Sequence, residues 1–291
     1  MKNSKAIFFA VLAAVLYAIN SPVSKLLLEN VPAKMMAGFL YLGAGIGIFL
    51  LGVVQKLTGT KQDEQPLTKK ELPYTIAMVV LDIAAPIFLM FGLTMTTAAN
   101  ASLLNNFEIV ATSIIALVIF KEAISKRLWL AIGLVTLSSA ILSFEDMSSL
   151  DFSYGSIFVL LACVCWGMEN NCTRNLSSKD PLDIVVIKGF CSGIGAFAIA
   201  VATGEKVPGW GYIAVALLLG FVAYGLSIYF YIYAQRYLGA AKTSAYYAIA
   251  PFVGTGLSLI IFRQAPTVSF IVATAIMIAG TYLATIDGAE Q

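Results

Sequence analysis

The stretch AANASLLNNFEIVATSIIALVIFKE, which runs from Ala98 to Glu122, decides how the chain folds. It is apolar over most of its length, and about 20 such residues are enough for a helix to cross the hydrocarbon core of a bilayer. Asn105, Asn106 and Glu108 nevertheless lie near its middle. A carboxylate at that depth is costly, and by default it marks a functional site. The stretch therefore predicts a membrane-spanning helix that carries a polar site.

The composition of the whole chain extends this prediction from one helix to the entire protein. Of its 291 residues, 59% are hydrophobic and 12% are charged, whereas a soluble domain has about 45–50% apolar and about 25% charged residues. The mean hydropathy is +0.88. A formal net charge of +2 is too small to indicate a nucleic-acid partner. We therefore expect a protein that crosses the lipid bilayer many times.

Several classes of chemistry are excluded or disfavoured by the residues present. The chain contains no histidine, which excludes HExxH zinc sites and Ser-His-Asp triads. Its four cysteines lie in hydrophobic segments without CxxC spacing, so they are interpreted as small core residues. No nucleotide-binding P-loop is present, so ATP-driven transport by this chain alone is not expected. We expect no cofactor and no bound metal.

Breaks in hydrophobicity predict an all-α polytopic membrane protein with ten membrane helices. Basic residues orient it, because cytoplasmic loops carry an excess of Lys and Arg. With the N-terminus in the cytoplasm, thirteen of the 18 basic residues lie on the cytoplasmic side and four lie outside, so both termini are predicted to be cytoplasmic. The linker from Gln55 to Glu71 would be cytoplasmic, and the loop from Ser143 to Ser153 would be external. The expected spans are 6–27, 33–54, 73–95, 98–120, 127–144, 154–175, 183–203, 210–235, 240–262 and 267–286.

Residues 1–148 and residues 149–291 are predicted to be two five-helix repeats. Polar and aromatic landmarks recur at an offset of 149 residues near the start of each half and at an offset of 142 residues near its end. Because five is an odd number, the second repeat would enter the membrane from the opposite face, as in the inverted repeats of many secondary transporters. The aligned landmarks are Tyr17 with Trp166, Asn20 with Glu169, Phe120 with Phe262, Lys121 with Arg263 and Glu122 with Gln264.

The end of the fourth helix of each repeat carries a motif that resembles a known transporter family. In the first half the motif runs from Phe120 to Glu122, with Gly133 beyond it, and in the second half it runs from Phe262 to Gln264, with Gln in place of Glu. With its ten expected helices, the chain is similar to EamA-type members of the drug/metabolite transporter superfamily. The resemblance implies exchange or export of small metabolites by alternating access, and it leaves the substrate open.

Polar residues of the expected fourth helix share one face, because residues three or four apart are neighbours on a helix. Asn105, Glu108 and Thr112 form this stripe. The stripe is interpreted as the wall of a water-filled cavity in which Glu108 binds a cation or takes up a proton. The structural alternative is a protonated Glu108 that is hydrogen-bonded to neighbouring helices.

Other candidates lie on the third, sixth and seventh expected helices. Asp82 precedes Pro86 by four residues, so its freed carbonyl could contact a ligand, or the two residues could simply mark a kink. Lys188 is deep enough either to pair with Glu169 or to contact a substrate carboxylate. Glu169 also shares a face with Cys165 and a second cysteine, where packing is favoured over a soft-metal site.

Aromatic side chains offer a further way to bind an organic cation, through their ring faces. The alternative is that these rings serve packing or lie at the membrane interface. The candidate cage comprises Tyr17, Trp166, Tyr224, Tyr229, Tyr246 and Tyr247. The candidate proton-coupling residues are Glu108, Asp82 and Glu169. The candidate substrate-binding residues are Tyr17, Asn20, Asp82, Asn105, Glu108, Thr112, Trp166, Glu169, Asn170, Lys188 and Tyr247.

Together these expectations predict a secondary active transporter, an exporter or exchanger, for a small polar metabolite. Because the mid-membrane charges are mostly acidic, a cationic or zwitterionic substrate is favoured, coupled to protons or driven by exchange. The alternatives are a lipid-carrier translocator on the same fold and, less favoured, an intramembrane enzyme. The expected partners are a small-molecule substrate, the lipid bilayer and, where coupling applies, protons, with monomer and dimer both open. The expected location is the plasma (cytoplasmic) membrane of a prokaryote.

Overall fold

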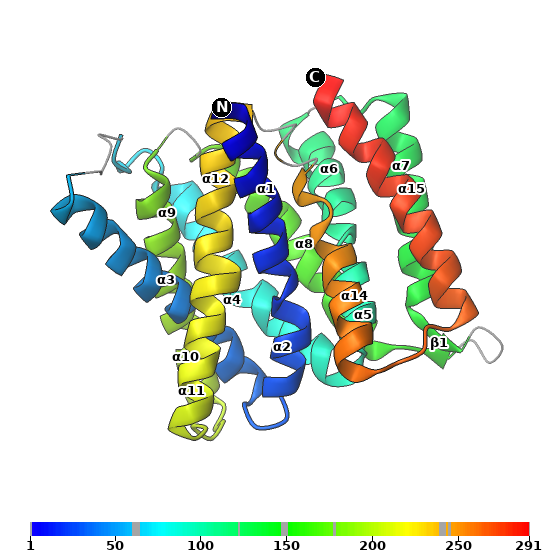
Figure 1. Cartoon of the computed structure of the whole chain (residues 1–291), viewed down its shortest axis with the longest axis horizontal. Helices are drawn as coiled ribbons and strands as arrows, with labels where there is room; N and C mark the ends of the chain where they lie inside the picture. The colour runs from blue at the N-terminus through cyan, green and yellow to red at the C-terminus, as the bar shows by residue number, and fades with distance from the viewer. Residues whose placement is uncertain are drawn as a thin grey trace.

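The computed structural model describes residues 2–59, 65–121, 123–146, 151–176, 179–238, 243 and 246–290. Helices account for nearly all of these residues and form one bundle (Figure 1). In the first half they are α1 (Lys2–Ala18), α2 (Asn20–Leu27), α3 (Ala33–Leu57), α4 (Leu72–Met95), α5 (Ala98–Leu104), α6 (Phe107–Phe120) and α7 (Lys126–Leu142). In the second half they are α8 (Tyr154–Arg174), α9 (Pro181–Ile187), the π-helix η1 (Lys188–Ser192), α10 (Gly193–Ala202), α11 (Trp210–Leu219), the π-helix η2 (Gly220–Leu226), α12 (Ser227–Leu238), α14 (Ala250–Phe262) and α15 (Val268–Glu290).

Seven helical segments within the described ranges are long and apolar enough to cross a bilayer, when helices that continue one another are taken together. Their limits agree with the expected spans to within a few residues. α14 is apolar but shorter. α7 has only 17 residues, and the last turns of α8 carry the polar run from Glu169 to Arg174, which lowers its hydropathy. The seven segments are Ser4–Leu27, Ala33–Leu57, Leu72–Met95, Ala98–Phe120, Pro181–Ala202, Trp210–Ala234 and Val268–Ile286.

The span that contains Glu108 is an interrupted helix. A turn at Asn105 and Asn106 divides it into α5 and α6. The Asn106 side chain donates a hydrogen bond to the carbonyl of Leu103 at 3.2 Å, and such local bonds compete with the helical ladder. The break places Glu108 in the first turn of α6. The backbone amides of Glu108 and Ile109 donate to the carbonyls of Asn105 and Asn106 at 3.1 Å and 3.0 Å, so the turn tightens the helix at this point.

Two other spans contain π-helical turns. η1 joins α9 to α10, and η2 joins α11 to α12. Both approach α3 closely: a Cβ atom added to Gly189 of η1 would lie 2.3 Å from the Cα of Gly45, and one added to Gly220 of η2 would lie 2.1 Å from the carbonyl oxygen of Leu40. Small residues permit this backbone contact between membrane helices. The two π-helices are therefore held against α3, and such turns are frequent at functional sites.

The packing places α8 in the middle of the bundle, against α4 and α6 (Figure 1). α7 and α15 pair along one edge, while α1 packs on α12, and α3 packs on α10, α11 and η2. The start of α1 and the end of α15 lie at the same end of the bundle. The largest cluster of buried apolar side chains draws residues from both halves of the chain, so the halves share one core.

Local features recur in the two halves at a constant spacing of 142 residues. α6 ends at Phe120 and α14 at Phe262. The next residues, Lys121 and Arg263, have φ values of 60° and 51°, and they are the only non-glycine residues with positive φ in the described part of the chain. Such a backbone conformation is uncommon outside glycine. The following helices, α7 and α15, begin six residues after each of these ends, with the hydroxyls of Ser125 and Thr267 accepting from backbone amides at their first turns.

The described residues also include two short strands in the loop between α7 and α8. β1 (Phe144–Asp146) and β2 (Asp151–Phe152) pair antiparallel. This small hairpin lies in the loop expected from Ser143 to Ser153. The fold is otherwise all-helical in the described ranges, as the sequence predicts.

Candidate functional site

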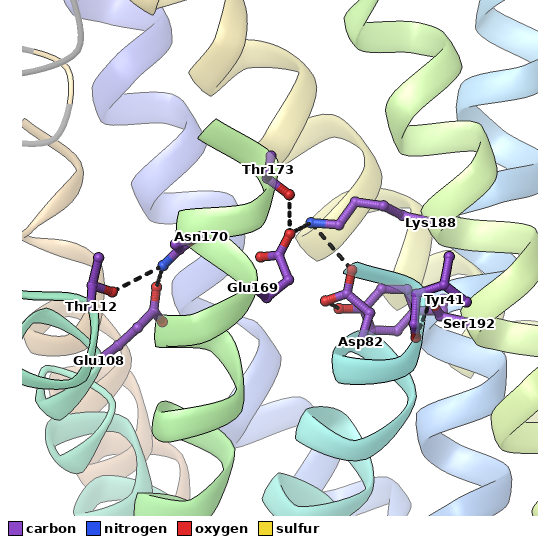
Figure 2. Close-up of polar contacts among 10 residues, drawn as sticks. Tyr41, Asp82, Glu108, Thr112, Glu169, Asn170, Thr173, Lys188 and Ser192 are labelled. Carbon is purple, nitrogen blue, oxygen red and sulfur yellow. Dashed lines mark hydrogen bonds and ion pairs between the residues drawn. The ribbon is translucent and has the colours of Figure 1, made fainter. Parts of the chain in front are cut away.

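α8 carries the polar residues around which the candidate site is built. Glu169 and Asn170 are consecutive on this helix, and Figure 2 shows their side chains directed to opposite sides of it. Asn170 contacts Glu108 on α6, whereas Glu169 contacts Lys188 at the start of η1. One helix therefore separates two polar clusters. We call them the Glu108 cluster (Glu108, Thr112 and Asn170) and the Lys188 triad (Asp82, Glu169 and Lys188).

The Glu108 cluster is a carboxylate held by an amide. The Nδ2 atom of Asn170 donates to Oε1 of Glu108 at 2.6 Å and lies 3.4 Å from Oγ1 of Thr112 (Figure 2). Asn171 fixes the same interface, because its side chain donates to the backbone carbonyl of Thr112 at 3.1 Å. Glu108, Thr112 and Asn170 are all only partly buried. The cluster therefore holds a positioned carboxylate that the protein does not fully enclose.

Tyrosine rings gather near this carboxylate. The ring centroid of Tyr17 lies 6.0 Å from that of Tyr224 and 5.9 Å from that of Tyr247. The charge of Glu108 interacts electrostatically with all three of these tyrosines. Tyr41 extends the group, with its centroid 5.2 Å from that of Tyr224. Because ring faces attract cations, the tyrosines and Glu108 form surroundings suited to a positive charge.

The Lys188 triad is a buried arrangement of three charged side chains. Nζ of Lys188 lies 2.8 Å from Oε1 of Glu169 and 3.3 Å from Oδ2 of Asp82 (Figure 2). The exposed fractions of Asp82, Glu169 and Lys188 are 1%, 4% and 8%. The hydroxyl of Tyr41 donates to Oδ1 of Asp82 at 2.8 Å, and the hydroxyl of Thr173 donates to Oε1 of Glu169. The triad thus joins α3, α4, α8 and η1.

Backbone packing fixes the positions of the triad residues. Lys188 opens η1, whose next residue, Gly189, is pressed against Gly45 of α3. Asp82 lies on α4, which continues as a helix through Pro86. Of the two sequence-based alternatives for Lys188, the structure has the ion pair with Glu169. Asp82 completes the triad through its side chain, a role that its spacing to Pro86 did not indicate.

The remaining expected site residues fall in different surroundings. Asn20 is buried and satisfied, since it donates to the Tyr224 hydroxyl at 3.3 Å and accepts from Ser24 at 3.0 Å. Asn105 is buried at the break, and among the described residues its Oδ1 atom has no hydrogen-bond partner. Trp166 lies in the main core.

The expected aromatic cage is therefore only partly assembled. Tyr17, Tyr224 and Tyr247 lie together, whereas Tyr246 is exposed and the hydroxyl of Tyr229 accepts from Gln55 at 2.8 Å. In the described part of the chain, no group of three or more His, Cys, Asp or Glu side chains could hold a metal ion.

The sequence reasoning missed one contributor, Tyr41. Thr173 lies four residues after Glu169, so helical spacing already predicts the shared face on which the two side chains meet. Tyr41 reaches Asp82 from another helix, α3, and no spacing along the chain indicates such a contact. The break at Asn105 and Asn106 had a local signal, because two consecutive asparagines are poor residues for a helix interior.

Known proteins are similar to this chain over most of its length. The model of the EamA-like transporter family matches residues 4–144 and 153–286. An uncharacterized transporter of Methanothermobacter thermautotrophicus is 23% identical over 288 residues, covering 93% of this chain and 83% of the relative. The uncharacterized transporter YyaM of Bacillus subtilis (strain 168) is 22% identical over 202 residues, covering 64% of each protein.

A protein solved by crystallography has a similar fold. The two structures superpose with a TM-score of 0.67, covering 98% of this chain and 97% of the other, at 14% sequence identity. At this level of identity, the likeness shows the fold alone.

Proposed function

Because the chain belongs to the EamA-like transporter family, we propose that it is a secondary active transporter that exports a small organic cation by alternating access, in exchange for protons. The family and the seven apolar helical segments make it an integral membrane transporter, as its sequence motifs predict. Its relatives in an archaeon and a bacterium support placing it in the plasma membrane of a prokaryotic cell.

The observation that carries the proposal is the geometry around Glu108. This carboxylate lies just after a helix break, is oriented by Asn170 at 2.6 Å, and remains partly accessible. Discontinuous helices commonly form the midplane substrate sites of secondary transporters. The rings of Tyr17, Tyr224 and Tyr247 would surround the rest of the ligand. An ammonium group would pair with Glu108, and the rings would contribute cation–π attraction.

The state of Lys188 favours a cation over a zwitterion. A zwitterionic substrate also needs a base for its carboxylate, and Lys188 was the candidate for that role. Its ammonium is already engaged by Glu169 and Asp82, at 2.8 Å and 3.3 Å. Releasing it would leave two buried carboxylates without their partner, which is strongly unfavourable. We therefore propose a substrate that carries positive charge without a carboxylate.

Alternating access is supported by the features that recur in the two halves. We propose that residues 1–148 and 149–291 are inverted five-helix repeats and that their ten helices all cross the membrane. The paired ends at Phe120 and Phe262, followed by the positive φ values of Lys121 and Arg263, recur at a spacing of 142 residues. The pairing of α7 with α15, each the last helix of its half, also agrees with a twofold relation. The paired residues Glu122 and Gln264 cannot be compared, because Glu122 lies outside the described residues.

The proposed orientation, with both termini in the cytoplasm, can be tested with a membrane-impermeant thiol reagent. Lys206→Cys and Lys70→Cys each place an exposed thiol at one side of the membrane, in a background with Cys191→Ser. Lys206→Cys should react in intact cells, and Lys70→Cys should react only after permeabilisation. The reverse pattern would overturn the orientation.

The proposed substrate class can be tested by ligand-induced stabilisation. Purified protein is heated with amines, amino acids, sugars, nucleosides and divalent metals, because a ligand that binds only the folded state stabilises it by about 2.7 kcal/mol at 100 times its Kd. Organic amines without a carboxylate should raise the unfolding temperature. Stabilisation by sugars or amino acids, and by no amine, would overturn the assignment.

A further inference from the structure

We propose that the Lys188 triad binds one proton, which the transporter exchanges for the organic cation at Glu108. This inference rests on the proposed function, because it names the partner site for the exchanged proton. It places that proton away from the substrate carboxylate, on the other side of α8 (Figure 2).

The charges of the triad do not balance. Asp82 and Glu169 are two carboxylates against one ammonium, and all three groups are buried. Taking an unpaired charge out of water is expensive, and more so within a membrane. One proton on the triad would leave a neutral acid beside a single ion pair. One proton therefore supplies the positive charge that the triad lacks.

Asp82 is the less completely compensated of the two carboxylates. Its Oδ1 atom accepts from Tyr41, but among the described residues no donor hydrogen-bonds to its Oδ2 atom. Lys188 forms an ion pair with Oδ2 at 3.3 Å and directs its hydrogen bond to Glu169, at 2.8 Å. A buried charge that lacks a full set of donors is unfavourable. Protonation of Asp82 removes that charge and leaves Lys188 paired with Glu169 alone.

The groups around the triad favour a proton over a metal ion as its ligand. From α3 the Tyr41 hydroxyl faces Asp82, with Tyr224 of η2 behind it, and from α8 the Thr173 hydroxyl faces Glu169. From α6, Glu108 interacts electrostatically with Glu169 and Lys188. A metal ion would need the central position between the carboxylates, which the Lys188 ammonium occupies.

The two sites are connected through α8. Glu169 and Asn170 are neighbours on α8, and Asn170 holds Glu108. A cation bound at Glu108 adds positive charge close to Glu169, so it makes a further proton on the triad less favourable. By linkage, the proton must weaken cation binding by the same factor. Mutual exclusion of this kind is what exchange of one proton for one cation requires.

The test measures how amine affinity depends on pH in purified protein. If one proton leaves the triad for each amine bound, the Kd of wild type falls about tenfold for each unit by which the pH rises. Asp82→Asn keeps the shape of the side chain but leaves Lys188 with one carboxylate. In this variant the Kd should be independent of pH and no proton should be released on binding. Glu169→Gln should behave alike, and Asp183→Asn on α9 is the matched control that keeps the wild-type slope.

A second measurement does not need a substrate. The infrared spectrum of wild type should contain the C=O band of a buried carboxylic acid, and Asp82→Asn should remove it. If the band and the pH slope persist in Asp82→Asn and disappear in Glu108→Gln, the proton lies on Glu108 and this inference is overturned. If no amine binds wild type, the proposed function fails, but the infrared band still decides whether the triad holds a proton.

Discussion

Glu108 and Glu169 are two carboxylates on adjoining helices, yet their surroundings differ in two respects. Glu108 is partly accessible and is held by a neutral amide, whereas Glu169 is buried and is held by an ammonium. A carboxylate whose partner is neutral keeps its charge available for a ligand. One that is already paired with a cation has its charge compensated, and it changes that charge only by taking up a proton. The difference in accessibility and in the charge of the partner thus favours substrate binding at Glu108 and proton coupling at the triad that contains Glu169.

The largest effect is expected from Lys188→Met. Breaking a buried ion pair by removing one partner costs about 3–5 kcal/mol, because the other charges remain buried. The variant should unfold at a much lower temperature than wild type in detergent. Lys179→Met is the control, since Lys179 and Glu71 form a partly buried ion pair 3.5 Å long next to the first residue of α4, outside the membrane spans, and pairs near the surface contribute about 0–1 kcal/mol. If the unfolding temperature falls equally in the two variants, the ion pairs of Lys188 stabilise the protein no more than the pair of Lys179 with Glu71.

A smaller loss is expected from Gly189→Ala, which should disturb the triad more than the Glu108 cluster. The added Cβ would meet the Cα of Gly45 at 2.3 Å, so η1 and Lys188 must move away from α3. Overpacking of this kind costs about 1–3 kcal/mol. The pH dependence of amine affinity should change as well. Gly133→Ala is the control, because its Cβ would meet no atom within 4 Å in the described structure; a similar loss there would contradict the packing argument.

Asn170→Ala tests the opposite side of α8. The side chain donates to Glu108 at 2.6 Å, and hydrogen bonds to charged groups contribute about 1.5–3 kcal/mol. Amine affinity should therefore fall about tenfold or more, while the slope of Kd against pH stays that of wild type. Titration calorimetry at several pH values measures both quantities. A lost slope with unchanged affinity would assign Asn170 to coupling and would remove the distinction between the two clusters.

The smallest effect is expected at Glu71, a carboxylate outside the membrane spans. The hydroxyl and the amide of Thr68 donate to it at 2.6 Å and 2.8 Å, and these bonds hold the pKa of Glu71 below its ordinary value. Its stabilising contribution is thus present above the ordinary pKa and is lost as the pH falls through the lowered value. Because the side chain is only partly buried and lies near the surface, Glu71→Gln should change thermal stability only slightly and only near and above that range. A change in amine transport would contradict this role.

Much of this fold could be predicted from the sequence, because membrane helices have a strong local signal. The limits of the helices, the shared landmarks of the two halves and the choice of Glu108 as a candidate all follow from hydropathy and from polar residues in apolar stretches. The family suggested by the motifs at Phe120 and Phe262 is confirmed. The inversion of the repeats and the orientation of the termini stay predictions.

The parts of the site that the sequence could not predict depend on contacts between helices that are distant along the chain. Tyr41, Asp82 and Lys188 lie on different helices, and only the packing of α3, α4 and η1 brings them together. The π-helices likewise lie in close contact with α3, and they have no evident sequence pattern of their own. Sequence spacing could indicate the pair of Lys188 with Glu169, but it could not indicate that Asp82 would join them.

The most direct test of the assignment of Glu108 is transport by reconstituted protein with the substitution Glu108→Gln. Glutamine keeps the shape and hydrogen-bonding capacity of the side chain but cannot carry the negative charge. Uptake of the stabilising amine is measured for wild type, Glu108→Gln and the exposed control Glu29→Gln, across about pH 5.5 to 8.5. We expect Glu108→Gln to lose transport at least about tenfold at every pH and Glu29→Gln to match wild type. If Glu108→Gln transports the amine at the wild-type rate with the wild-type pH profile, the carboxylate is structural and the proposed substrate site is wrong.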